Sequence, residues 1–167
     1  LTDPLPPQTA ALVLPGGFPE QFTTDLSANV VARQQVRDLA SAGAPIHAEC
    51  AGLTYLVEEL DGHPMCGVLS GSARFTDRLT LGYREAVAVA DSTLHAIGDR
   101  VMGHEFHRTT VAFGGSYPPA WVFAGRTRDG AVHRGVHASY LHTHPAAHPE
   151  AIARFVAAAE PRLSSRG

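Results

Sequence analysis

The sequence has few cysteines, no long apolar run and no strong excess of either charge. Two cysteines, Cys50 and Cys66, are too few for a disulfide framework, which favours free thiols and a cytoplasmic location. No stretch reaches the roughly 18 apolar residues of a membrane span and no signal-peptide pattern is present, so we expect no membrane contact. A net charge of -3 without basic runs argues against a nucleic-acid partner.

The overall composition is that of a globular protein. Hydrophobic residues make up 44% of the 167 positions and charged residues 17%, which is typical of a chain that buries a core. Because residues 1–10 contain three prolines and no periodicity, we expect them to be an extended lead-in. We expect a single domain over residues 11–160 and a flexible tail over residues 161–167.

The first third of the chain alternates between strand and helix patterns. The apolar run at 11–14 stops at a Pro-Gly-Gly loop, and a second short run covers 44–49. Helical spacing of apolar residues predicts helices over 27–42 and 51–60. This alternation predicts an α/β fold of three layers, in which helices cover both faces of a mostly parallel sheet.

The rest of the chain is richer in strand patterns. Runs of β-branched and aromatic residues lie at 79–90, 101–113, 120–127 and 130–142, between Gly, Pro and Asp punctuation. We expect some of these strands to form an antiparallel extension of the sheet. A helix that starts at Pro149 closes the chain.

Cys50 stands at a predicted strand-to-helix junction. A nucleophile on such a sharp turn needs small residues two positions away on each side, and these are Ala48 and Gly52. The start of the following helix would favour the thiolate, and the N–H of Ala51 could help to hold an oxyanion. A buried inert cysteine is the alternative, and the local pattern leaves both interpretations open. Cys66 lies in a loop and is predicted to be structural.

A catalytic cysteine needs a base, and the histidines near the C-terminus are candidates. In "VHASYLHTH" a strand would place His142 and His144 on one face with Tyr140. The end of such a strand could deliver a histidine to the cysteine. Because H-x-H followed by H-x3-H has no accompanying cysteine or well-placed acid, it does not predict a metal site.

The segment "GHEFH" does not match the H-E-x-x-H zinc helix, because His104 and His107 are three residues apart. As a strand it would turn Glu105 and His107 to the face opposite His104. Glu105 could then orient a catalytic histidine, although an ordinary solvated acid fits the pattern equally well.

Four segments together resemble one family: "LPGGFPE", "PIHAECAGLTYL", "GHEFH" and "ASYLHTH". They are similar to the C-terminal glutamine amidotransferase domain of the cobyrinic and hydrogenobyrinic acid a,c-diamide synthases of cobalamin biosynthesis. The resemblance implies a class I, flavodoxin-like amidotransferase fold in which Cys50 attacks L-glutamine and forms a thioester. It further implies that Gly16, Gly17 and Ala51 hold the oxyanion and that His142 transfers the proton.

The same resemblance implies that the chain needs further components. Ammonia would pass to an N-terminal synthetase domain that uses ATP and Mg²⁺, whereas this chain carries no phosphate-binding G-x-x-x-x-G-K-[ST] loop and needs no cofactor of its own. The fold is expected to be truncated at its N-terminus and to form a homo-oligomer through its exposed edge. Which tetrapyrrole is amidated stays open.

The sequence also departs from the superfamily pattern at one position near His142, and two other functions stay open. The wider superfamily has a glutamate two residues after the histidine, where this chain has His144, so Glu105 is the candidate for the orienting acid. A cysteine hydrolase of the DJ-1/PfpI type and a non-catalytic docking domain are the alternatives. The segments "GHEFH" and "SYLHTH" have no place in the DJ-1/PfpI pattern, and specific labelling of Cys50 by a glutamine analogue would argue against a docking domain.

Overall fold

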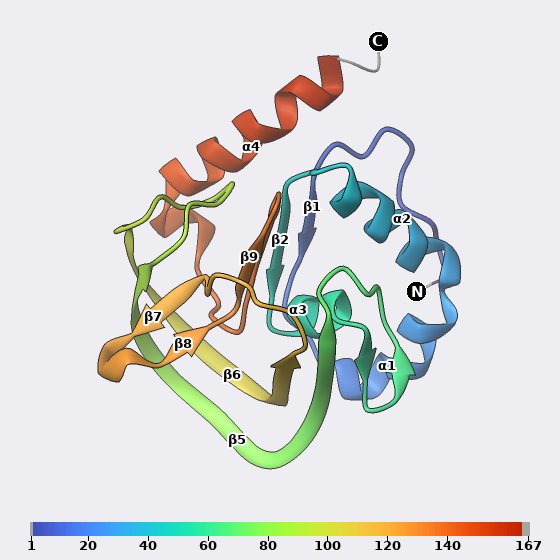
Figure 1. The fold of residues 1–167 in the computed structure, drawn as a ribbon, viewed down its shortest axis with the longest axis horizontal. Coiled ribbons are helices and arrows are strands. Elements are labelled where there is room, and N and C mark those ends of the chain that lie inside the picture. Colours follow the sequence, from blue (N-terminus) through green and yellow to red (C-terminus); the bar gives the residue numbers. More distant parts are fainter. Residues whose placement is uncertain (1, 165–167) are drawn as a thin grey trace.

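Two sheets and four helices make up the protein in the computed structural model, which describes the backbone of residues 2–164 and the side chains through residue 160. The first sheet has the order β1-β2-β10-β9, and its first three strands are parallel (Figure 1). Its strands are β1 (Leu12–Leu14), β2 (Ile46–Glu49), β10 (Val136–Ser139) and β9 (Ala131–His133). The predicted α/β class and the parallel strands at 11–14 and 44–49 are confirmed.

The antiparallel extension is larger than the sequence predicts, because it forms a second sheet of six strands. Two long strands, β5 (Gly71–Ala88) and β6 (Arg100–Phe113), pair as a hairpin along most of their length. The other strands of this sheet are β3 (Glu59–Leu60), β4 (His63–Pro64), β7 (Trp121–Phe123) and β8 (Arg128–Asp129). Figure 1 shows β5 and β6 curving together below the first sheet.

The helices begin and end at points that differ from the predicted ones. They are α1 (Pro19–Ala28), α2 (Val30–Ser41), α3 (Ala51–Leu56) and α4 (Pro149–Ser164), with 3-10 turns at Ala124–Arg126 and Pro145–Ala147. The helix predicted over 27–42 is α2, which begins later because Asn29 caps it by accepting a hydrogen bond from the N–H of Ala32. α1 precedes it as a separate helix that the sequence did not predict. The helix predicted over 51–60 stops at Leu56, because Val57 is extended.

One main core cluster joins the parallel sheet to α2 and α3. Val36 and Leu39 of α2 pack there with Ile46 and Ala48 of β2 and with Leu53 of α3. Figure 1 shows α4 on the other side of this sheet from α2. α2 and α3 therefore pack against β2, and Cys50 follows directly at the end of this strand.

The described chain begins with a segment that packs against the fold and ends within α4. Residues 2–10 form neither helix nor strand, but Leu5 packs partly against the main core and its N–H donates to Gln35 Oε1 at 2.7 Å. α4 continues to Ser164, into the segment expected to be a tail, and residues 165–167 lie outside the described residues. In the described part of the chain, no helix is both long and apolar enough to cross a bilayer.

Candidate active site

Cys50 occupies a sharp turn between β2 and α3. Its backbone has φ 52° and ψ -102°, a conformation that residues with a side chain rarely adopt. The turn brings α3 so close to β1 that a Cβ on Gly52 would collide with the carbonyl oxygen of Leu14. Ala48 on the other flank is fully buried. The predicted elbow is therefore present, and its small flanking residues are required by close packing.

His142 is brought to this turn by a segment that follows β10. Buried Asp129 accepts hydrogen bonds from the N–H of Tyr140 at 3.0 Å and of Leu141 at 3.3 Å through Oδ2. The backbone of His142 then pairs with that of His104, with N···O distances of 2.9 and 3.1 Å. The two imidazole rings stack with their centroids 4.9 Å apart. The "GHEFH" segment thus fixes His142 in place.

Glu49, next to the cysteine in sequence, is the acid that contacts His142. Its Oε2 lies 3.6 Å from His142 Nδ1, while its Oε1 accepts hydrogen bonds from Thr143 N–H at 3.0 Å and from Thr143 Oγ1 at 3.1 Å. His47 Nε2 lies 3.2 Å from the same Oε1. Burial raises the pKa of Glu49, but the hydrogen bonds from His142 and His47 outweigh it and hold that pKa far below its usual range.

The electrostatics of His142 follow from its two neighbours. Hydrogen bonding with Cys50 and then with Glu49 raises the pKa of His142 from 6.5 to about 9, against the opposing effect of burial. The Cys50 thiol also lies 3.7 Å from the carbonyl oxygen of Phe106, which can accept its proton in a weak hydrogen bond. Cysteine, histidine and glutamate therefore form a contiguous chain.

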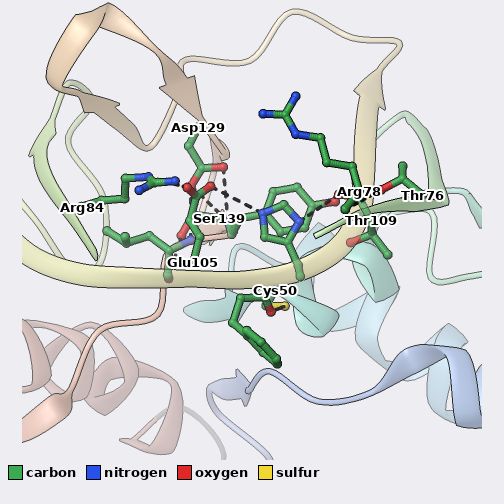
Figure 2. A network of polar contacts seen from close by, with 12 residues as sticks. Cys50, Thr76, Arg78, Arg84, Glu105, Thr109, Asp129 and Ser139 are labelled. Carbon is green, nitrogen blue, oxygen red and sulfur yellow. Dashed lines mark hydrogen bonds and ion pairs between the residues drawn. The ribbon is translucent and has the colours of Figure 1, made fainter. Parts of the chain in front are cut away.

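Glu105 does not take the role that the sequence suggested. Its Oε2 accepts a hydrogen bond from Arg84 Nε at 2.6 Å, and its Oε1 lies 3.5 Å from His107 Nε2. Hydrogen bonding to His107 and Arg84 outweighs burial and lowers the pKa of Glu105. Figure 2 shows Glu105 beside Arg84 and Asp129. The alternation of β6 explains this, because Glu105 and His104 point to opposite faces of the strand.

The glycine loop after β1 closes the site from the other side. A Cβ on Gly16 would collide with the imidazole of His142, and a Cβ on Gly17 would lie 4.0 Å from that of Ala51. Gly16 therefore lies against His142, and Gly17 lies near Ala51, the residue after Cys50. Gly17, Cys50 and His142 line one cavity of about 410 Å³, which is large enough for an amino acid.

Two other candidates lie outside this cluster. β10 ends at Ser139, so the predicted alternation does not extend to His144, which instead accepts a hydrogen bond from the N–H of Ala146. Cys66 is fully buried, and burial raises its pKa to about 12, which makes it an inert thiol. Among the described residues, no group of three or more His, Cys, Asp or Glu is placed to hold a metal ion.

Glu49 directly precedes the candidate nucleophile, but this position alone does not predict a contact with His142. The sequence does not predict that β2 pairs with β10, and in this pairing Glu49 lies opposite Ser139. That pairing brings the segment after β10 across the end of β2, and so brings His142 to Glu49.

A parallel sheet with a cysteine elbow and a histidine from a later strand end defines the class I glutamine amidotransferase fold. One solved glutamine amidotransferase shares it with a TM-score of 0.63 at 20% identity, covering 88% of this chain and 79% of the other. A glutamine amidotransferase of Thermotoga maritima gives a TM-score of 0.59 at 15% identity, covering 99% of this chain and 68% of the other. The predicted fold is confirmed.

Within that class the chain belongs to the family of CobB/CobQ-like glutamine amidotransferase domains, which it matches over residues 1–150. A hydrogenobyrinate a,c-diamide synthase of Mycobacterium tuberculosis is 69% identical over 161 residues, which are 94% of this chain and 35% of that protein. The enzyme of the same name from Streptomyces coelicolor is 58% identical over 154 residues, 91% of this chain and 32% of that protein. The chain therefore spans about a third of the length of these relatives.

Proposed function

We propose that this chain is the glutaminase domain of an a,c-diamide synthase of cobalamin biosynthesis. It would release ammonia from L-glutamine for the amidation of two ring acetate carboxylates, and the high identity to hydrogenobyrinate a,c-diamide synthases favours hydrogenobyrinate as the ring. The observation that carries the proposal is the contact chain of Cys50, His142 and Glu49 at the wall of an amino-acid-sized cavity.

The first half of the proposed reaction forms a thioester. The Cys50 sulfur attacks the amide carbon of glutamine and a C–S bond forms, while the proton that Cys50 and His142 share rests on His142. The negative charge on the amide oxygen is held by the backbone N–H groups of Gly17 and Ala51. His142 then protonates the amide nitrogen, the C–N bond breaks, and ammonia leaves behind a γ-glutamyl thioester.

The second half restores the enzyme. Water replaces ammonia in the site, His142 takes a proton from it, and the oxygen attacks the thioester carbon. The C–S bond breaks, glutamate leaves, and the proton returns to the Cys50 sulfur. No oxidant, reductant or metal is needed in either half.

Glu49 is proposed to be the positioning residue of this pair. Its carboxylate lies against Nδ1 of His142, so Nε2 is the nitrogen left to exchange a proton with Cys50. A carboxylate in this place also stabilises the imidazolium that forms in each half of the reaction. The backbone and hydroxyl of Thr143 hold Glu49 in this orientation.

The amidation itself is assigned to the part of the longer relatives that this chain does not span. We expect ATP and Mg²⁺ to act there, on the carboxylates that receive the ammonia. The isolated chain should therefore hydrolyse glutamine to glutamate and ammonia without ATP.

The decisive experiment compares glutamate release and covalent labelling in matched variants. Cys50→Ala should abolish release and labelling by a glutamine-like chloroketone, whereas Cys66→Ala should retain both, because Cys66 lies outside the cavity. Undiminished release in Cys50→Ala would exclude Cys50 as the nucleophile. Labelling of both cysteines at equal rates would favour a non-catalytic docking domain.

A further inference from the structure

The cavity that contains Cys50 also contains two side chains of opposite formal charge. Apart from its histidines, the charged residues that line it are Glu20 and Arg108. If the proposed glutaminase function holds, the ligand is an α-amino acid whose amide lies at Cys50. Its α-ammonium and α-carboxylate then lie a few bonds away and need partners of opposite charge.

Arg108 is held at this cavity by an irregularity in the long hairpin. The register of β5 and β6 shifts between Phe75 and Thr80, where extra residues of β5 stand opposite β6. Arg108 lies at this bulge, and its Nη1 donates to the carbonyl oxygen of Asp77 at 2.6 Å. In Figure 2 the bulged segment with Thr76 and Arg78 lies beside Thr109, the neighbour of Arg108. Bulges commonly redirect a side chain beside an active site.

The guanidinium retains donors for a ligand. Within the described part of the chain, Nη1 is the only atom of the Arg108 side chain with a hydrogen-bond partner. A guanidinium presents five N–H donors in a fork that matches a carboxylate. Its exposed position suits the mouth of a cavity, where the charged end of an amino acid would lie.

Glu20 lines the same cavity from a different element, α1. It lies in the first turn of α1, directly after the glycine loop that faces His142. Its carboxylate has no hydrogen-bond or ion-pair partner among the described residues. It is therefore available to accept hydrogen bonds from an ammonium group.

We propose that Arg108 binds the α-carboxylate of the substrate and that Glu20 binds its α-ammonium group. Together they select a free L-amino acid over amides that lack either charge, and they set the distance at which the side-chain amide meets Cys50. This inference rests on the proposed glutaminase function but can fail independently of it.

Three amides test each half of the clamp formed by Glu20 and Arg108. L-Glutamine carries both charges, its α-methyl ester lacks the carboxylate, and 4-carbamoylbutanoate lacks the ammonium. The native chain should lose roughly 10- to 100-fold in kcat/KM for either analogue, as expected for a lost charge-assisted hydrogen bond. Arg108→Gln should bind glutamine correspondingly more weakly and no longer discriminate against the ester. Glu20→Gln should no longer discriminate against 4-carbamoylbutanoate.

Matched controls separate this pattern from a general loss of structure. Arg100→Gln and Glu85→Gln remove exposed charges at the far end of the same hairpin, outside the cavity, and should leave all three amides unaffected. Calorimetric titration of the three amides into Cys50→Ala gives the same comparison without turnover.

The outcomes also separate the two proposals. Equal losses on all three amides, or unchanged discrimination in both variants, overturn the clamp while glutaminase activity stands. Absence of both glutamate release and glutamine binding in the native chain overturns the clamp and the proposed function together.

Discussion

At the scale of single residues, the protonation of His142 depends on the carboxylate beside it. Glu49→Gln removes a hydrogen bond and a negative charge, so the pKa of His142 should fall from about 9 toward its ordinary value of 6.5. NMR titration of the imidazole protons measures this shift. Glu105→Gln is the matched control and should leave the titration unchanged, because Glu105 contacts Arg84 and His107. If the pKa of His142 fell in Glu105→Gln and stayed unchanged in Glu49→Gln, Glu105 would be the orienting acid instead.

The same raised pKa links His142 to stability. Because the folded pKa lies above the unfolded one, protonated His142 stabilises the fold fully below about pH 6.5, and this contribution is lost as the pH rises through about 9. The contribution should be smaller in Glu49→Gln. Denaturant unfolding at pH 6 and pH 9.5 should therefore show a smaller loss of stability between these pH values in the variant.

Gly16 is the second residue on which the geometry of His142 depends. A methyl group there would push against the imidazole, and a displacement near 1 Å can cost about 100-fold in rate. Gly16→Ala should therefore lower kcat for glutamate release by about 100-fold. In Gly17→Ala the methyl would stay 4.0 Å from Ala51 Cβ, so a smaller loss is expected. Equal losses in the two variants would contradict a steric role for Gly16.

At the scale of elements, buried Asp129 on β8 ties the segment after β10 to the second sheet. Burial raises the pKa of Asp129 from 3.8 to about 6, although the hydrogen bonds that it accepts from the N–H groups of Tyr140 and Leu141 lower this pKa. Its ionisation therefore destabilises the fold as the pH rises from about 4 to 6. Asp129→Asn keeps an acceptor without the charge and should be more stable at pH 7.5 by on the order of 1–3 kcal/mol. In urea unfolding this gain should vanish near pH 4, and a gain at both pH values would contradict the charge explanation.

Elements with a strong local signal were predicted correctly, and those fixed by distant partners were not. The apolar runs at β1 and β2 and Pro149 at the start of α4 needed only neighbouring residues. No helix was predicted over α1, although Pro19 stands in its first turn, where proline is common. The end of α3 at Leu56 depends on Leu60 pairing in β3, a tertiary contact.

The residues of the candidate site also divide into those that the local sequence predicts and one that depends on a distant strand. The family resemblance implied Gly16 and Gly17. Cys50 and Ala51 could be identified from flanking residues, and His142, together with His144, from the alternation of a predicted strand. Glu49 could not, because only the register between β2 and β10 shows that its carboxylate meets His142. A strand face can be predicted from the sequence, but the partner across a parallel sheet cannot.

At the scale of the whole molecule, apolar side chains gather around the mouth of the cavity. Phe18, Leu81 and Phe106 line the cavity and are exposed by 56%, 62% and 47%. Tyr83 and Met102 continue this face along the hairpin, exposed by 83% and 53%. An apolar face of this kind commonly marks a protein contact. The surface around the proposed glutamine site thus has the apolar character of a docking surface.

The sequence predicts a homo-oligomer through an exposed sheet edge, and in the isolated chain we expect this apolar face of the hairpin to pair with a second copy instead. Tyr83→Glu combined with Met102→Glu should weaken the dimer at least about tenfold, because burying one such side chain contributes roughly 1.5–3 kcal/mol. Sedimentation velocity over a range of concentrations measures this. Ile97→Glu, an equally exposed apolar position outside this face, should leave the dimer intact. A clean monomer of the native chain at high concentration would contradict self-association.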